Sequence, residues 1–350
     1  MKRHAGFLCG IALIMLLVFS LASCSGPEAD KDTVPEEPRR FIIDTDSGAD
    51  DVAAIILAAK DSSIKIEGVT VLAGNVDLEQ GTENALMALE TAGVSAPVYK
   101  GAAESVSKVK FDLFSVFGED GMGDADLIHP SAKAEDKPAV DFILETVKAY
   151  PGEIEIIALG PATNIANAIQ KDPETMEQVK MIWSLGTTGL GTGNATPVAE
   201  FNVFNDAEAY KIMLDSGVPV TVTGLDMCRG DAMWTDEQFS KLEASGDIGW
   251  FIAKSFEKIR VFYKQNGRET LSVCDPETVM CALQKDFLKD SISCHACCIT
   301  DEGVTHGEVI FYEEGFTYDI EVPEDMEYNT TLVTDEDKDG YFNRCLNAIR

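Results

Sequence analysis

The sequence predicts an α/β protein with an open, mainly parallel central sheet flanked by helices. Short apolar runs alternate with stretches of helical length from residue 40 onward, a pattern typical of βαβ units. Polar residues or glycines follow these runs, as they do where a parallel sheet presents its carboxyl ends to a ligand. With 350 residues, 45% of them hydrophobic, the chain can bury a large core, so we expect one α/β domain over residues 40–350.

The expected elements follow one another in the order strand, helix, strand. Apolar and β-branched runs predict strands over residues 41–43, 64–72, 153–159, 180–185 and 218–223. Helical periodicity predicts helices over residues 50–60, 79–92, 163–170 and 206–216. Crossover connections of this length join parallel strands, which gives the sheet its expected direction.

The charge balance excludes one class of partner. The chain has 60 Asp and Glu against 28 Lys and Arg, a formal net charge of -32. Binding a polyanion needs a basic face, and no block of the sequence supplies one. We therefore expect no binding of nucleic acid, whereas a negative surface suits cations or solubility at a cell surface.

The first residues predict export. Residues 1–23 have a basic start, an apolar run and small residues at the end, which is typical of a secretion signal; an unprocessed membrane-spanning helix is the alternative. Residues 21–24 resemble the lipobox of bacterial lipoproteins, which implies that Cys24 carries the lipid that anchors the protein to the outer face of the cell membrane. Residues 24–39 are rich in Pro, Glu and Asp and predict a solvated tether.

The cysteines do not predict a disulfide framework. Of nine cysteines, Cys9 leaves with the signal and Cys24 is lipidated, so seven remain at irregular spacing; export would nevertheless permit bridges. Cys294, Cys297 and Cys298 lie beside a histidine, which is compatible with zinc. Because no second Cys/His pair lies at the spacing of a zinc finger, strand or core cysteines are the favoured interpretation.

Four carboxylates lie within eight residues, at the expected junction of the first strand and helix: Asp44, Asp46, Asp50 and Asp51. Partly buried, they would repel one another and be driven toward protonation. The helix dipole would favour two of them by only ~0.3–1 kcal/mol each. All nearby ligand atoms are oxygens, so the pattern predicts a hard divalent cation; helix capping by Asp50 and Asp51 beside a solvated loop is the alternative.

Residues 44–51 also resemble the D-x-D-x-G-x-D-D signature of the nucleoside hydrolases, which cleave the N-glycosidic bond of ribonucleosides with bound calcium. Four further segments match in the same order: residues 73–76, 158–166, 193–202 and 274–276. The resemblance extends over roughly residues 40–345. It implies a Rossmann-like α/β fold, a ribonucleoside substrate, and a homodimer or homotetramer.

The resemblance assigns roles to individual residues. It implies that Asp46, Asp51 and Asp275 bind Ca²⁺ together with the carbonyl of Leu159, and that Asp46 is the general base toward the attacking water. Five positions match those that hold the ribose hydroxyls: Asp50, Asn75, Asn194, Glu200 and Asn202. Asn75, Asn194 and Asn202 could instead form turns or cap a helix, whereas Glu200 is harder to explain by structure alone; all of them fit one site together.

Two positions depart from the family pattern. Cys274 stands where the family often has a histidine that could protonate the leaving base; a thiol with a pKa of ~8.5 would be protonated at neutral pH and could donate. Phe117 stands where some pyrimidine-preferring members have a histidine, and it could stack on a base or belong to the core. The sequence does not reveal which base is preferred.

Other interpretations remain open at this stage. A solute-binding lipoprotein that captures a nucleoside or sugar would share the anchor and the α/β build, but would usually have two lobes. A phosphohydrolase with an aspartate nucleophile would use Asp44 and Asp46. Residues 335–340 mimic the start of a calcium-binding EF-hand loop but lack its glutamate at position twelve, so we expect a surface turn there.

Overall fold

The computed structural model describes residues 37–107, 116–319 and 326–350. Pro38–Arg350 form one compact unit. The expected signal sequence and nearly all of the tether, with Cys24, lie outside the described residues. Within the described part of the chain, no helix is both long and apolar enough to cross a membrane.

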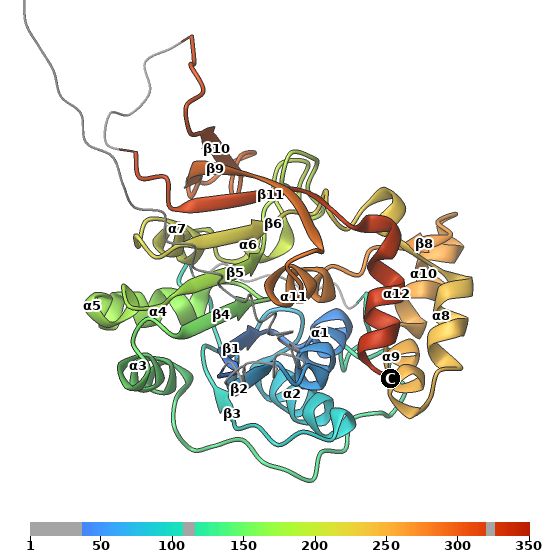
Figure 1. The fold of residues 1–350 in the computed structure, drawn as a ribbon. Helices are drawn as coiled ribbons and strands as arrows, with labels where there is room; N and C mark the ends of the chain where they lie inside the picture. Colours follow the sequence, from blue (N-terminus) through green and yellow to red (C-terminus); the bar gives the residue numbers. More distant parts are fainter. Residues whose placement is uncertain (1–36, 108–115, 320–325) are drawn as a thin grey trace, which may run out of the picture. The chain divides into compact units, whose positions relative to one another are not determined.

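A nine-stranded sheet forms the centre of the described fold, in the order β10-β9-β11-β6-β5-β4-β1-β2-β3 (Figure 1). Its strands are β1 (Arg39–Thr45), β2 (Ile64–Val71), β3 (Val98–Lys100), β4 (Ile154–Ala158), β5 (Met181–Leu185), β6 (Val220–Thr223), β9 (Leu288–Cys298), β10 (Val309–Glu313) and β11 (Thr330–Glu336). All neighbouring pairs from β3 to β11 are parallel, and β9 is antiparallel to both of its neighbours. The expected open, mainly parallel sheet is confirmed. A short separate ladder pairs β7 (Trp234–Thr235) with β8 (Thr270–Leu271).

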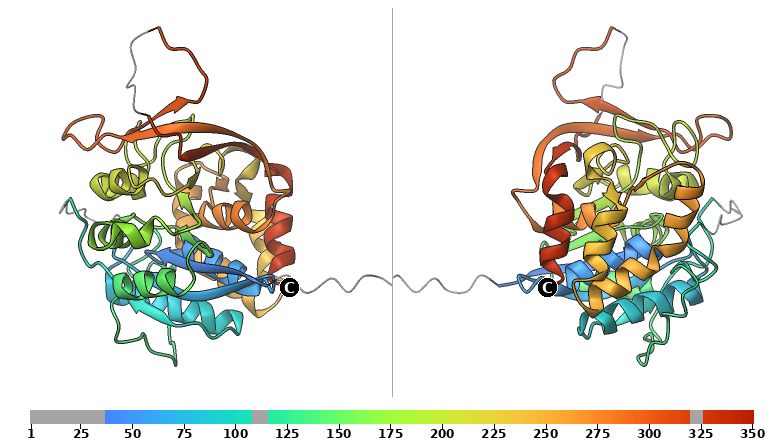
Figure 2. Two further views of the ribbon diagram at one scale, coloured as in Figure 1. Left: turned by 60° about the vertical axis from the view of Figure 1, so that its left-hand side comes forward. Right: turned by 90° about the vertical axis from the view of Figure 1, so that its right-hand side faces the viewer.

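Helices cover both faces of the sheet. They are α1 (Ala49–Lys60), α2 (Leu78–Ala92), α3 (Ala139–Ala149), α4 (Thr163–Lys171), α5 (Pro173–Met176), α6 (Phe201–Asn205), α7 (Ala207–Leu214), α8 (Asp236–Glu243), α9 (Asp247–Ser255), α10 (Glu257–Gln265), α11 (Asp275–Leu283) and α12 (Lys338–Ala348). Figure 1 shows α3, α4 and α7 on one side and α1, α11 and α12 on the other. In the right-hand view of Figure 2, α8, α9, α10 and α12 form an outer group.

The alternation of side chains along the strands divides the core in two. Phe41 and Ile43 of β1 belong to the apolar cluster that includes α1, α2 and α11, whereas Ile42 between them belongs to the cluster with α3, α4 and α7. Successive residues of a strand point to opposite faces, so a strand buried on both faces is apolar at every position. This is why the short apolar runs were recognisable as strands.

The strands and helices expected from residues 41 to 223 are present, with bounds that differ by up to a few residues. The antiparallel part was not foreseen, because exposed Lys289 and Asp290 interrupt the apolar pattern of β9. Cys294 and Cys298 are buried in that strand, which agrees with the strand interpretation. The surface turn expected at residues 335–340 is wrong in part, because β11 continues to a buried Glu336 and α12 begins at Lys338. The continuous central sheet of the described residues also differs from the two lobes of a solute-binding protein.

Glu155 is a charged side chain buried within β4. Its carboxylate accepts hydrogen bonds from Arg39 Nε at 2.9 Å, Lys180 Nζ at 3.0 Å and Trp183 Nε1 at 2.9 Å. Burial raises the pKa of Glu155, but the hydrogen bonds that it accepts outweigh this effect and hold its pKa below the ordinary value. The ionised form is therefore favoured in the folded state, and it ties three neighbouring strands together.

Replacement of this side chain, Glu155→Gln, should lower the free energy of unfolding at pH 7 by about 2 kcal/mol, because bonds to a charged acceptor are lost. A group with a lowered folded pKa contributes stability above its ordinary pKa and loses it as the pH falls through the folded value. Urea unfolding should therefore show that the difference in free energy of unfolding between Glu155→Gln and the unchanged protein becomes smaller toward pH 4 and below. Glu153→Gln, at an exposed ion pair with Arg40, is the control and should change stability by about 0.5 kcal/mol or less. An equal loss in both variants would contradict this account.

Candidate active site

Polar side chains from several strand ends meet at one edge of the sheet. Asp46 follows β1, Asn75 follows β2 and Leu159 follows β4, while Asp275 begins α11. Asp46, Asp51 and Asp275 are at most 2% exposed. The structure therefore brings the three aspartates expected at a cation site into the protein interior, although Asp275 lies more than two hundred residues after the others in the sequence.

Asn75 holds the first two aspartates. Its backbone N–H donates to Asp46 Oδ2 at 2.6 Å, and its side-chain Nδ2 reaches Asp46 Oδ1 at 3.2 Å and Asp51 Oδ2 at 3.1 Å. Asp51 also accepts from Thr45 Oγ1 at 2.5 Å and from the N–H of Gly48 at 3.0 Å, at the start of α1. Asp51 thus caps the start of α1, as the alternative interpretation expected. The same residue also belongs to the group of acids.

Asp275 completes the acidic cluster. Ligand atoms of Asp50, Asp51 and Asp275 all lie within 4.8 Å of one another, because α1 and α11 pack side by side (Figure 1). Asp275 Oδ1 is buried without a hydrogen-bond partner. A buried carboxylate oxygen normally has a hydrogen-bond donor or a cation as its partner, and this oxygen has no donor.

The cluster is electrostatically unfavourable by itself. Burial, followed by the charge of Asp51, raises the pKa of Asp46 well above its ordinary value. Burial and the same neighbour raise the pKa of Asp50 to about 7, and burial with Asp50 raises that of Asp275. Among the described Lys, Arg and His residues, none forms a salt bridge to these carboxylates. Buried acids without a cation from the chain are a donor set that fits a hard metal ion.

The loop after β5 supplies the remaining predicted residues. Asn202 donates from Nδ2 to the carbonyl of Leu159 at 2.6 Å. Glu200 caps α6 by accepting from the N–H groups of Asn202 at 2.8 Å and Val203 at 3.1 Å. Asn194 is exposed and accepts from the N–H of Phe201 at 2.9 Å. Burial raises the pKa of Glu200 to about 7. Asn202 is thereby fixed beside the Leu159 carbonyl, and Glu200 is fixed at the start of α6.

Asp44 has a different environment from its neighbours. It is fully buried and accepts from Thr70 Oγ1 at 2.5 Å and from Asn164 Nδ2 at 2.8 Å, and burial raises its pKa to about 7. These bonds join β1 to β2 and to the start of α4. The sequence assigned no role to Thr45, Thr70 or Asn164, although Asn164 lies in one of the matching segments; polar residues beside buried strand ends were the available signal.

Cys274 and Phe117 are the two residues that the sequence analysis considered for contact with the leaving group. Cys274 is not a free thiol, because it forms a disulfide with Cys228. It therefore has no sulfur-bound proton, and the expectation that its thiol could protonate the leaving base is wrong for this form of the protein. Phe117 is half-buried, packs against the core cluster and meets Phe256 edge-on at 6.2 Å between ring centres, which agrees with the core alternative.

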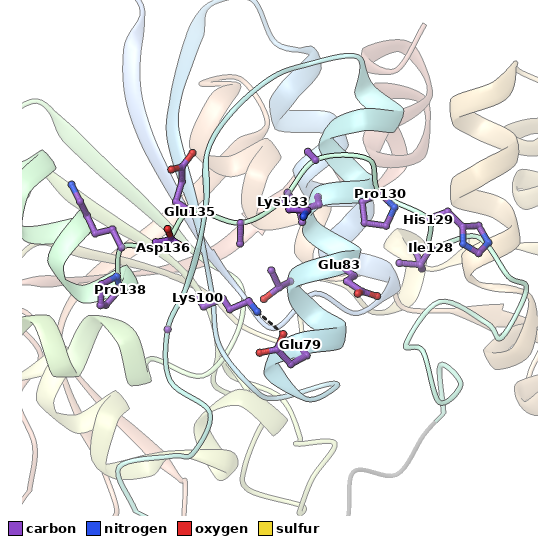
Figure 3. A pocket seen from close by; sticks show the side chains of 16 residues that line it. Glu79, Glu83, Lys100, Ile128, His129, Pro130, Lys133, Glu135, Asp136 and Pro138 are labelled. Carbon is purple, nitrogen blue, oxygen red and sulfur yellow. Dashed lines mark hydrogen bonds and ion pairs between the residues drawn. The ribbon is translucent and has the colours of Figure 1, made fainter.

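A hollow among the described residues lies elsewhere. It has a volume of about 970 Å³ and lies between α2 and residues 128–138, and Figure 3 shows the ion pair of Lys100 with Glu79 at its side. None of the predicted site residues lines it. Its polar, open walls carry no cluster comparable to the acidic one, so the strand-end cluster is the candidate active site.

Comparisons with known proteins identify the family of this chain. Residues 41–343 match the family described as inosine-uridine preferring nucleoside hydrolase. The chain belongs to this family. It is 38% identical to uridine nucleosidase 1 of Arabidopsis thaliana over 270 residues, 76% of this chain and 80% of that protein. It is 35% identical to a pyrimidine-specific ribonucleoside hydrolase of Escherichia coli over 211 residues, 60% of this chain and 66% of the relative.

Solved structures of nucleoside hydrolases have the same fold. A plant nucleoside hydrolase superposes with a TM-score of 0.83 at 27% identity, covering 89% of this chain and 99% of its own. A purine-preferring ribonucleoside hydrolase from Gardnerella vaginalis gives 0.80 at 28% identity, covering 89% and 98%. The chain is therefore an enzyme, an N-glycosyl hydrolase of the nucleoside hydrolase type, and not a phosphohydrolase or a solute receptor.

Gly74 and Gly160 leave the space that Asp46 occupies. A Cβ at Gly74 would lie 2.0 Å from Asp46 Oδ2, and one at Gly160 would lie 2.9 Å from the backbone nitrogen of Asp46. Contacts this short cannot persist, so the carboxylate or the backbone would have to move. Both glycines are thus required by the close approach of neighbouring strand ends to Asp46.

The variant Gly74→Ala should lower kcat/KM for a ribonucleoside by about 100-fold, because displacing a reacting group by about 1 Å has a cost of that order. The measurement is initial-rate kinetics, with thermal unfolding as a check of folding. Gly267→Ala is the control: nothing lies within 4 Å of its Cβ, but its φ of +73° is strained for alanine. It should lose about 1 kcal/mol of stability and keep its activity. If kcat/KM of Gly74→Ala were unchanged, the reaction would not depend on the present position of the Asp46 carboxylate.

Proposed function

We propose that this enzyme hydrolyses the N-glycosidic bond of ribonucleosides, releasing the base and ribose, with bound Ca²⁺ and with Asp46 as general base. The observation that carries the proposal is the group of buried Asp51 and Asp275 with half-buried Asp50, whose ligand atoms lie within 4.8 Å of one another, together with an unpartnered oxygen on Asp275. Membership of the nucleoside hydrolase family supports the reaction type.

Asp46, Asp51, Asp275 and the carbonyl of Leu159 would hold the cation. All of these ligands are oxygens, which suits a hard cation, and Ca²⁺ accepts six to eight of them in flexible geometry. A bound cation would lower the pKa of a water molecule and would offer a ligand position to the ribose hydroxyls. The hydrogen bond from Asn202 to the Leu159 carbonyl orients that ligand in advance.

Asp46 is held in position for proton transfer. Two groups of Asn75 donate to its two oxygens, so the carboxylate cannot rotate freely. Without a cation, burial and the charge of Asp51 raise the pKa of Asp46; a cation bound beside it would favour the ionised carboxylate, which can accept a proton from water. The chain itself provides the negative surroundings that would stabilise a developing positive charge on the sugar.

The ribose would be bound by hydrogen bonds from the strand-end residues Asp50, Asn75, Asn194, Glu200 and Asn202. Such groups pair with hydroxyls, and a site built on these bonds rejects a substrate that lacks one of them. We propose uridine as the first substrate to examine, since the most similar relatives reported above are named for uridine and pyrimidine ribonucleosides. Deoxyuridine is the matched poor substrate.

We also propose that the enzyme acts as a lipoprotein on the outer face of the cell membrane. The basic, apolar and small-residue order of residues 1–23 and the cysteine at position 24 support this location. The acidic tether of residues 24–39 would keep the folded unit away from a negatively charged membrane surface.

The catalytic proposal is tested with Asp46→Asn. Base release from uridine, followed by chromatography, should fall by 10³-fold or more, because the general base and a cation ligand are both lost. Asp215→Asn removes a carboxylate from an exposed ion pair with Lys211 and should keep full activity. A calcium chelator should abolish the activity of the unchanged enzyme, and added Ca²⁺ should restore it. Full activity after exhaustive chelation would exclude a calcium-dependent reaction.

The location is tested by expressing the full-length chain and its Cys24→Ser variant in a bacterium that lipidates exported proteins. We expect the unchanged chain in the membrane fraction and the variant in soluble or secreted fractions, because one cysteine carries the lipid. Metabolic labelling with a fatty acid, followed by immunoblotting, reports the modification directly. Equal distribution of both proteins, without label, would contradict the anchor.

A further inference from the structure

The disulfide between Cys228 and Cys274 lies beside the acidic cluster and is unused by the proposed reaction. Its cysteines are 46 residues apart in sequence and 5.4 Å apart at Cα. With Leu185 and Leu225 they form a small apolar cluster of their own, separate from the two main ones. Leu185 ends β5, so the bridge lies where β5, the segment after β6 and the start of α11 meet.

One half of the bridge is connected to the carboxylates. Cys274 immediately precedes Asp275, whose carboxylate has a ligand atom within 4.8 Å of those of Asp50 and Asp51. The carbonyl of Cys274 accepts from the N–H of Glu277 at 3.0 Å in the first turn of α11. A movement of Cys274 would therefore move Asp275 relative to the other two carboxylates.

The other half is connected to the loop that carries Asn194. The N–H of Leu225 donates to the carbonyl of Thr187 at 3.2 Å, and Asp226 Oδ2 accepts from the N–H of Leu190 at 3.0 Å. Arg229, next to Cys228, donates to Thr192 Oγ1 at 2.8 Å and to the carbonyl of Gly193 at 3.2 Å. Residues 225–229 thus clamp the loop of residues 187–193, which leads directly into Asn194.

We propose that the Cys228–Cys274 disulfide is a positioning cross-link, which holds the Asn194 loop in register with Asp275 so that the cation and the ribose are bound together. The inference rests on the proposed function, because it connects Cys274 with binding of the cation and Cys228, through the Asn194 loop, with binding of the ribose. Loss of the bridge leaves the clamp and α11 joined only by non-covalent contacts. Affinity for Ca²⁺ and for the ribonucleoside should then fall together.

The chemistry of the cross-link is a two-electron exchange. Its formation joins two thiols into one S–S bond, while the two electrons and two protons that they lose convert an exchanging disulfide into a dithiol. A dithiol such as dithiothreitol reverses it by two successive exchanges, giving two protein thiols and a cyclic disulfide. An exported protein meets the oxidising conditions under which such a bridge persists.

The remaining cysteines of the described residues offer a contrast. Cys281, Cys294, Cys297, Cys298 and Cys345 are free thiols there. Cys297 lies in β9 and is half-buried, with His295 Nε2 at 3.1 Å from its sulfur. A Cys297→Ser variant therefore controls for the loss of a cysteine outside the cross-link.

The experiment compares the mature enzyme, oxidised and reduced under native conditions, with Cys228→Ser, Cys228→Ser/Cys274→Ser and Cys297→Ser. The enzyme is alkylated with and without prior treatment with dithiothreitol, and its intact mass is measured. The reduced enzyme should carry two more alkyl groups than the oxidised enzyme. Calorimetric titration with Ca²⁺ should show affinity about tenfold weaker in the reduced enzyme and in both Cys228 variants. KM for uridine should rise by a similar factor, with a smaller change in kcat.

Reductant should not alter the Ca²⁺ affinity or the KM of the double variant. Cys297→Ser should have the same Ca²⁺ affinity and KM as the enzyme without substitutions. The inference is overturned by complete labelling before reduction, or by equal Ca²⁺ affinity and KM in the oxidised and reduced enzyme. If a variant fails to fold, as judged by circular dichroism, the reduced enzyme alone decides. Activity that does not depend on Ca²⁺ or Asp46 would contradict the proposed function, whereas calcium-dependent activity insensitive to reduction contradicts only the cross-link.

Discussion

Repulsion among buried carboxylates is the constraint on which the site depends. Asp46, Asp51 and Asp275 are almost completely buried, and no described basic side chain forms a salt bridge to them. Burying an unpaired carboxylate costs several kcal/mol, so a protein tolerates such a group where a cation or a proton compensates it. The fold maintains this unfavourable cluster through hydrogen bonds from Asn75, Thr45 and Gly48.

The parallel sheet explains how these groups come together. Adjacent parallel strands end at the same edge, so β1 and β2 are followed there by Asp46 and Asn75, and β4 by the backbone carbonyl of Leu159. The glycines at positions 74 and 160 let the strand ends approach Asp46 more closely than any side chain would allow. The same edge receives α11, whose packing against α1 adds Asp275 from the distant end of the chain.

The start of α11 has two functions that sequence reasoning treated separately. Asp275 precedes a proline at the beginning of a helix, where an acidic residue is favoured for structural reasons, and it also completes the acidic group. Cys274 was considered only as a proton donor, whereas it is joined to Cys228. A bridge between irregularly spaced cysteines cannot be recognised from their count, because pairing depends on which backbone segments lie about 5–6 Å apart.

The sequence alone determined the class of fold, the first five long strands and the identity of the acidic residues. These features follow from local patterns: apolar runs buried on both faces, helical periodicity and oxygen ligands clustered around a glycine. The tertiary structure decided which residues meet. It turned Asn202 toward the Leu159 carbonyl, paired Cys228 with Cys274 and added the antiparallel strands β9 and β10. It also brought Asp275 to Asp51, as the family resemblance had implied. Contacts between residues far apart in sequence depend on the packing of whole helices and strands, and no local pattern encodes that packing.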